Sequence, residues 1–281
     1  MNSKKLVIVL ISLLLVTGFP RLVLAETVLE KIKRMGEMNA GVRKDAIPFG
    51  YVDERGEWTG YSVDLIRLIH KQVEKKINQP IKLNLREATI DSRFPLVKQG
   101  TVDIMCGATT ITQTRLKVVD FSVPFFMTGA QFLVKIGEAR KFDYNGTLKN
   151  IPIAFIPGTT TQEIIPQIYP FAQWKNIKSR REGVEELKKG EVKAVVSDGI
   201  LLLGELVQQG NNLKDFALMP RQPMTTELYG CILPKNNPEW KQFVDLTIVA
   251  PENRTLQEKW FSIKTGKFPY IIPSNPEPGF D

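Results

Sequence analysis

Residues 151–165, with the sequence IPIAFIPGTTTQEII, carry the pattern that decides the fold. The apolar run 151–156 predicts a buried strand, and Gly158-Thr159-Thr160-Thr161 predicts the start of a helix. In open α/β sheets, ligands bind at the carboxyl ends of strands, where the next helix offers free backbone N–H groups. A similar loop, Gly107–Thr110, follows another predicted strand. Helix N-capping alone would explain either loop. Because one such loop occurs in each half of the chain, however, the pattern predicts two half-sites that face a cleft.

Apolar runs alternate with helical patterns along the chain, which indicates an α/β protein. The expected strands are Asn39–Arg43, Ile81–Glu87, Val102–Cys106, Gln131–Lys135, Ile151–Ile156, Ala194–Ser197 and Glu227–Leu233. The expected helices are Tyr61–Val73, Phe94–Lys98, Gly158 towards Ile165, Gly183–Lys189, Gly199–Gln208, and segments around Trp240–Val249 and Asn253–Phe261. We expect Gln131–Lys135 to cross from one α/β set to the other, and the last part of the chain to return. Two crossings predict two lobes and a hinge.

The first residues predict an export signal. Met1–Lys5 carries two lysines, Leu6–Val16 is apolar, and Val23-Leu24-Ala25 offers small residues suited to signal peptidase. The apolar run is about half the length of a helix that spans a bilayer, although a retained anchor is the alternative. No cysteine stands directly after that run, so we expect no lipid anchor. The sequence therefore predicts a signal peptide at residues 1–25 and a mature chain in the periplasm.

The formal charge of +8 is distributed in a way that argues against nucleic-acid binding. Removal of Lys4, Lys5 and Arg21 with the signal peptide leaves about +5. The basic residues are scattered among acids, whereas nucleic-acid binders concentrate positive charge in runs. We therefore expect no nucleic-acid partner, and a positive balance that suits an anionic ligand.

The chain has two cysteines and one histidine, and this limits its chemistry. Cys106 and Cys231 permit one disulfide in an exported protein, which would tie the C-terminal part back to the N-terminal part. A structural zinc site needs four ligands, so we expect no metal. His70 lies in a helical pattern beside Ile69, and we expect it to be a surface or packing residue rather than a catalyst.

Motifs follow one another in a fixed order over nearly all of the mature chain: Gly41-Val42-Arg43 to Tyr51, Gly60-Tyr61-Ser62-Val63-Asp64-Leu65, Gly100-Thr101-Val102-Asp103-Ile104, Thr109-Thr110 to Arg115, Asp120-Phe121-Ser122, Gly158-Thr159-Thr160, Ala194 to Asp198, and Tyr229-Gly230-Cys231. This order resembles the family 3 periplasmic solute-binding proteins of ABC transporters, which bind polar amino acids. The resemblance implies a two-lobed type II Venus-flytrap fold with two crossover hinge strands. Lobe 1 would comprise residues 26–132 plus 228–281, and lobe 2 residues 133–227. We expect a monomer without cofactors that delivers its ligand to a membrane permease.

The segment Ser92–Leu96, with Cys106-Gly107 and the Tyr229-Gly230-Cys231 strand, resembles the glutamate/aspartate-binding branch of that family most closely. The resemblance implies that Arg115 binds the ligand α-carboxylate as a bidentate pair. The Thr110 and Thr159 hydroxyls would help it.

Three further roles follow from the same resemblance. Asp198 would accept from the ligand α-ammonium, and Arg43 and Arg93 would receive the side-chain carboxylate. For any one arginine, a surface ion pair is the alternative explanation. Arg43, Arg93 and Arg115 against Asp198 would leave an excess of positive charge, which favours a dicarboxylic amino acid such as glutamate or aspartate.

The chain departs from the acidic-ligand branch at two positions. Ala108 stands where that branch tends to have a serine, so only the backbone carbonyl can serve there. The branch also has a histidine near the position of Arg180 or Arg181. We take Arg180 as the candidate that adds a donor to the side-chain carboxylate, while solvent exposure is the alternative. Because of these departures, another polar amino acid, such as glutamine, remains an alternative ligand.

Two other classes of protein deserve comparison. A cyclohexadienyl-type dehydratase on the same fold would need a cleft acid to protonate a leaving hydroxyl. The sequence offers Asp198 as counter-ion and no other evident cleft carboxylate, so we expect no enzyme. A receptor sensor would need a transmembrane helix or signalling domain after Asp281, and the sequence contains none there.

Overall fold

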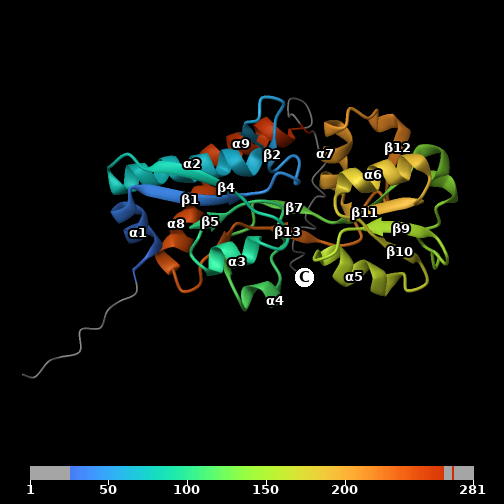
Figure 1. The fold of residues 1–281 in the computed structure, drawn as a ribbon, viewed down its shortest axis with the longest axis horizontal. Helices are drawn as coiled ribbons and strands as arrows, with labels where there is room; N and C mark the ends of the chain where they lie inside the picture. The colour runs from blue at the N-terminus through green and yellow to red at the C-terminus, as the bar shows by residue number, and fades with distance from the viewer. Residues whose placement is uncertain (1–25, 263–267, 269–281) are drawn as a thin grey trace, which may run out of the picture.

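The computed structural model of the protein describes residues 26–262 and 268, and the predicted signal peptide lies outside them. An α/β set forms each of the two lobes (Figure 1). The sheet of lobe 1 has the order β4-β1-β5-β14-β6, and its strands are Lys82–Glu87, Glu37–Val42, Ile104–Met105, Ile232–Leu233 and Asp120–Phe121. The sheet of lobe 2 has the order β10-β9-β11-β8-β12, and its strands are Gln173–Asn176, Pro152–Phe155, Ala194–Asp198, Ala130–Lys135 and Phe216–Met219.

Helices flank both sheets. Lobe 1 contains α1 Val28–Met35, α2 Tyr61–Ile77, α3 Arg93–Lys98, α4 Gln113–Leu116, α8 Pro238–Val249 and α9 Pro251–Phe261, with the small hairpin β2 Tyr51–Val52 and β3 Trp58–Thr59. Lobe 2 contains α5 Thr160–Ile168, α6 Arg180–Lys189 and α7 Gly199–Gln208, with the short 3₁₀ helices η1 Ile136–Lys141 and η2 Leu213–Asp215. On α2, Leu65, Ile69 and Val73 are buried together, as the helical spacing of apolar residues predicts. The α/β alternation is therefore confirmed.

The two crossings differ from the expected ones. Strand β7, Phe126–Thr128, pairs antiparallel with β13, Glu227–Tyr229, and both lie between the lobes in Figure 1. The predicted crossing at Gln131–Lys135 is wrong, because that stretch pairs with β11 and β12 inside the sheet of lobe 2. Gly129 separates the crossing strand from β8; a Cβ there would lie 1.8 Å from the Thr225 carbonyl oxygen.

The predicted strand Glu227–Leu233 is divided in the structure. Its first part is β13 in the crossing pair, and its second part is β14 in the sheet of lobe 1. Cys231, just before β14, forms a disulfide with Cys106, just after β5. The bridge closes a sequence separation of 125 residues and ties the returning chain to the N-terminal part of lobe 1. Within the described part of the chain, no helix is long and apolar enough to cross a membrane.

Candidate ligand site between the lobes

Side chains from both lobes converge on a cavity of about 20 Å³ at the carboxyl ends of strands. Its lining includes every residue that the sequence singled out for ligand binding: Arg43, Arg93, Thr110, Arg115, Thr159, Arg180 and Asp198. A wider groove of about 620 Å³, bordered by segments of both lobes around Asp45, Thr89 and Gly158, lies beside it. The inner space is close to that of one water molecule, so an amino acid can enter only if the lobes separate.

Arg93 is the least satisfied of these cations. It is 3% exposed, and it donates only long hydrogen bonds, 3.5 Å to the Ala108 carbonyl and 3.4 Å to the Gly158 carbonyl of the opposite lobe. Its Nε has no partner. Burial, followed by the charges of Arg43 and Arg115, lowers the pKa of Arg93 to about 9. A carboxylate placed against Arg93 would therefore remove an electrostatic cost.

Arg43 already has a carboxylate partner that the sequence analysis missed. Its Nε and Nη2 donate to the two carboxylate oxygens of Asp45, at 2.8 and 2.6 Å. Burial by itself would raise the pKa of Asp45, but the Arg43 guanidinium outweighs it, and that pKa falls to about 2. Arg43 is therefore paired bidentately within lobe 1, although a third nitrogen, Nη1, reaches the Ala108 carbonyl at 3.4 Å.

Arg180, and not its neighbour Arg181, faces the cavity. Arg180 is 5% exposed and donates to Ser197 Oγ at 3.0 Å and, across the cleft, to the Asp45 carbonyl at 3.1 Å. The Arg181 side chain is 55% exposed and lies 3.7 Å from Glu205. Ser179 is the N-cap of α6, so Arg180 is the first residue of that helix.

The remaining lobe 1 cation, Arg115, and the lobe 2 loop that contains Thr159 also line the cavity. Arg115, on α4, is oriented by a 2.8 Å hydrogen bond from Nη1 to the Thr110 carbonyl. The Thr159 hydroxyl accepts from the Gln162 amide as the N-cap of α5 and donates to the Ile156 carbonyl at 2.8 Å. Capping therefore occupies the Thr159 hydroxyl, which leaves the free N–H groups of the first α5 turn as the donors that this loop offers.

Two acidic side chains lie at the hinge side of the cleft. Asp198 ends β11, accepts from the Tyr229 hydroxyl through Oδ2, and has no partner at Oδ1. Burial, followed by the nearby Glu227 charge, raises the pKa of Asp198 to about 7. Glu227, on β13, is 1% exposed. Among the described residues, Asp198 is the one carboxylate that lines the cavity, while Asp45 lines the wider groove beside it and Glu227 lies behind Thr110 and Thr160.

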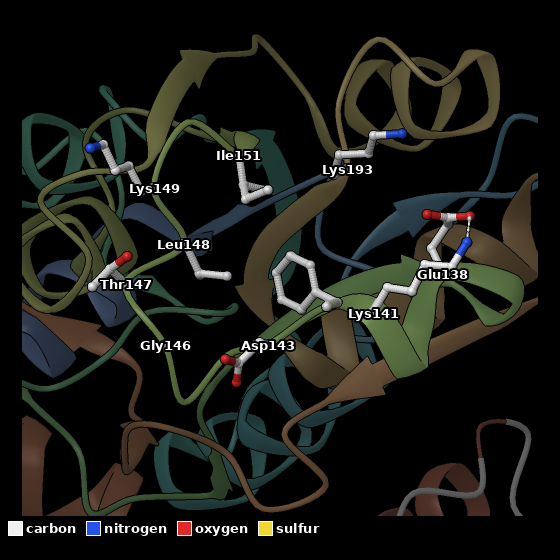
Figure 2. Close-up of a pocket in the computed structure, with 10 residues that line it drawn as sticks. Glu138, Lys141, Asp143, Gly146, Thr147, Leu148, Lys149, Ile151 and Lys193 are labelled. Atoms are coloured by element: carbon white, nitrogen blue, oxygen red, sulfur yellow. Dashed lines mark ion pairs between the residues drawn. The ribbon is translucent and has the colours of Figure 1, made fainter.

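A different hollow, of about 410 Å³, lies on lobe 2 alone. Figure 2 shows Leu148 and Ile151 among its lining residues, with Lys141, Lys149 and Lys193 around them, and Phe142 also lines it. Its residues come from η1, the loop before β9, and Lys193. None of its described lining residues belongs to lobe 1, and none is a buried polar group. Among residues 26–262 and 268, no cluster of His, Cys, Asp and Glu could hold a metal ion.

The fold and the cleft define a class: a two-lobed binding protein with charged groups from both lobes around one small site. Residues 38–263 match the bacterial extracellular solute-binding proteins, family 3, and the chain belongs to that family. It is 32% identical over 242 residues to the glutamate/aspartate import solute-binding protein of Salmonella typhimurium, covering 84% of this chain and 79% of the relative. It is 34% identical over 245 residues to the L-glutamate/L-aspartate-binding protein of Pseudomonas aeruginosa, covering 83% and 80%.

Two further matches widen the range of ligands among similar proteins. A glutamine-binding protein of Geobacillus stearothermophilus is 30% identical over 184 residues, covering 65% of this chain and 69% of the relative. The crystal structure of an ancestral amino-acid-binding protein, described as a precursor of cyclohexadienyl dehydratase, has a TM-score of 0.71 and 26% identity, covering 83% of this chain and 99% of that chain. The predicted two-lobed fold is confirmed, and the curated relatives are transport proteins rather than enzymes.

Proposed function

We propose that this protein is the substrate-binding component of an ABC transporter, and that it binds glutamate or aspartate between its lobes and delivers it to a membrane permease. We further propose that residues 1–25 direct it to the periplasm and are removed there. The lobe boundaries 26–132 plus 228–281 and 133–227 remain part of the proposal, except that residues 130–132 belong to β8 in the sheet of lobe 2. The observation that carries the choice of ligand is the buried, incompletely paired guanidinium of Arg93.

Charge balance supports an acidic ligand. Among the described residues, the guanidinium groups of Arg43, Arg93, Arg115 and Arg180 face the carboxyl groups of Asp45, Asp198 and Glu227. When all seven groups are ionised, one net positive charge remains. A dicarboxylic amino acid carries a net charge of −1 and would neutralise it. Because most of these groups, Asp45 and Arg115 excepted, are buried, an unmatched charge among them is costly, on the order of 2–5 kcal/mol. That cost corresponds to a factor of tens to thousands in affinity.

The structure supports a division of roles among the cavity residues. Arg115 and the first N–H groups of α5 would bind the α-carboxylate, and Asp198 Oδ1 would accept from the α-ammonium. Arg93 and Arg180 would receive the side-chain carboxylate. Asp45 occupies two nitrogens of Arg43, so the direct role expected for Arg43 passes largely to Arg93.

Glutamine is the second candidate ligand, because a glutamine-binding protein is among the relatives. An amide in place of the carboxylate would leave Arg93 without a counter-charge, so we favour the acid. Calorimetric titration of residues 26–281 with glutamate, aspartate, glutamine and arginine tests the choice. Glutamate or aspartate should bind at least tenfold more tightly than glutamine, and tight arginine binding would exclude the acidic site.

Three arginine variants test the proposed roles. Arg115→Ala should abolish binding of every α-amino acid, whereas Arg93→Ala should weaken glutamate far more than glutamine. Arg181→Ala is the matched control, since it removes the same charge one residue from Arg180 but outside the cavity. Equal, small effects of Arg93→Ala and Arg115→Ala would contradict the assignment.

A further inference from the structure

Glu227 accepts hydrogen bonds from hydroxyls of both lobes. Its Oε2 accepts from Thr110 Oγ1 of lobe 1 at 2.5 Å and from Thr160 Oγ1 of lobe 2 at 2.6 Å. Its Oε1 accepts from Thr225 Oγ1 at 3.1 Å. Thr110 and Thr160 both line the ligand cavity, whereas Glu227 stands behind them on the hinge strand. The carboxylate thus contacts the site through two hydroxyls.

A hydroxyl group has one hydrogen and two lone pairs, so its hydrogen can be donated only once. In Thr110 and Thr160 the hydrogen is donated to Glu227, and each oxygen can then only accept from a ligand. Thr225 shows the same arrangement completed within the protein: it donates to Glu227 while its Oγ1 accepts from the Ala130 amide at 2.9 Å. Within residues 26–262 and 268, no N–H group donates to the hydroxyl oxygen of Thr110 or Thr160.

We propose that Glu227 is a positioning residue that fixes the hydroxyl hydrogens of Thr110 and Thr160 and so makes both oxygens acceptors for the ligand α-ammonium group. This inference rests on the proposed binding of an α-amino acid, and it changes the role expected for the Thr110 hydroxyl from carboxylate donor to ammonium acceptor. An ammonium group has three N–H donors. Thr110 Oγ1, Thr160 Oγ1 and the free Oδ1 of Asp198 supply three acceptors on the wall of one cavity.

The arrangement offers both acceptors and donors to the ligand backbone. Thr110 Oγ1, Thr160 Oγ1 and Asp198 Oδ1 are the acceptors, while the Arg115 guanidinium and the N–H groups of the first α5 turn are the donors that remain for the α-carboxylate. Because Thr110 and Thr160 belong to different lobes, the ammonium group would contact both lobes only when the cleft is closed. Glu227 therefore contributes to selection of α-amino acids over acids that lack the amino group.

The test compares glutamate with glutarate, which has both carboxylates but no amino group, on wild type, Glu227→Gln and Glu227→Met. Glutarate is measured by competition. Glutamate should bind at least tenfold more weakly to Glu227→Met than to wild type. The loss should be smaller in Glu227→Gln, which keeps one acceptor oxygen. Glutarate affinity should change less than threefold. Equal losses for both ligands, or unchanged glutamate affinity in Glu227→Met, would overturn the inference.

A double-mutant cycle with Thr110→Val shows whether Glu227 acts through the hydroxyl. The loss that Thr110→Val causes in wild type should largely vanish in Glu227→Met; full additivity would contradict the positioning role. If wild type prefers glutamine, the pair becomes glutamine and glutaramate, and the test of Glu227 is unaffected. A wild type that binds no α-amino acid would refute the proposed function itself, and with it this inference.

Discussion

Lowering the pH from 8 to 6 should weaken amino-acid binding by about tenfold, because the ligand ammonium requires an ionised Asp198. Burial, followed by the charge of Glu227, raises the pKa of Asp198 to about 7 in the closed, ligand-free arrangement of the lobes. About nine-tenths of the molecules then carry the ionised carboxylate at pH 8, and about one-tenth at pH 6. The affinity falls in the same ratio, which corresponds to about 1.4 kcal/mol.

Stability without ligand should change in the opposite sense. The pKa of Asp198 is higher in the folded than in the unfolded chain, so the folded state retains a proton that the unfolded state loses. The resulting stabilisation is complete below the unfolded pKa, near 4, and is lost as the pH rises through about 7. Relative to Asp198→Asn, the wild type should therefore lose thermal stability between pH 5 and pH 8 while its affinity for ligand increases.

Isothermal titration at pH 6, 7 and 8, in two buffers that differ in ionisation enthalpy, measures both the affinity and the protons released. Nearly one proton should be released per glutamate at pH 6 and almost none at pH 8. The chain has one histidine, His70, whose Nε2 lies 2.6 Å from the Ile81 carbonyl on lobe 1, so His70→Gln is the control for titration elsewhere.

Tyr229→Phe provides a second check, because the tyrosine hydroxyl lowers the pKa of Asp198. Its removal should move the midpoint of the affinity profile to higher pH. A dissociation constant that stays within twofold from pH 6 to pH 8 would refute the ammonium role of Asp198, as would a midpoint that moves to lower pH in Tyr229→Phe.

Two further predictions concern closure and stability. A Cβ at Gly204 on α7 would lie 2.2 Å from a backbone oxygen of lobe 1, so Gly204→Ala should hinder closure and weaken ligand binding at least tenfold. Gly137 has open space around it, so Gly137→Ala should leave the affinity unchanged. Equal affinities of the two variants in calorimetry would contradict this packing. Replacement of Cys106 and Cys231 by alanine should cost about 2–5 kcal/mol, because the bridge closes a loop of 125 residues. The midpoint of thermal unfolding should fall on the order of 5–15 °C. Two reactive thiols in the unfolded, unreduced wild type would exclude the bridge.

Local sequence patterns predicted most of the regular structure. The helical spacing of apolar residues on α2 and the continuous apolar run of β9 depend on near neighbours in the chain, so the sequence reveals them directly. The first helix, α1, was missed although it carries a capping box of Thr27 and Glu30, a signal that was available. Strand β10, Gln173–Asn176, was also missed, because an exposed edge strand lacks an apolar pattern.

Local sequence patterns indicate the strand–loop–helix units, and the family resemblance indicates the residues that surround the cavity. The partners of those residues become visible only in the three-dimensional arrangement. Asp45 lies two residues from Arg43, yet its bidentate pairing depends on how the chain turns after β1. Glu227 became a cleft carboxylate because β13 pairs with β7 between the lobes. Burial and hydrogen-bond direction depend on contacts between distant segments, and such contacts have no local pattern in the sequence.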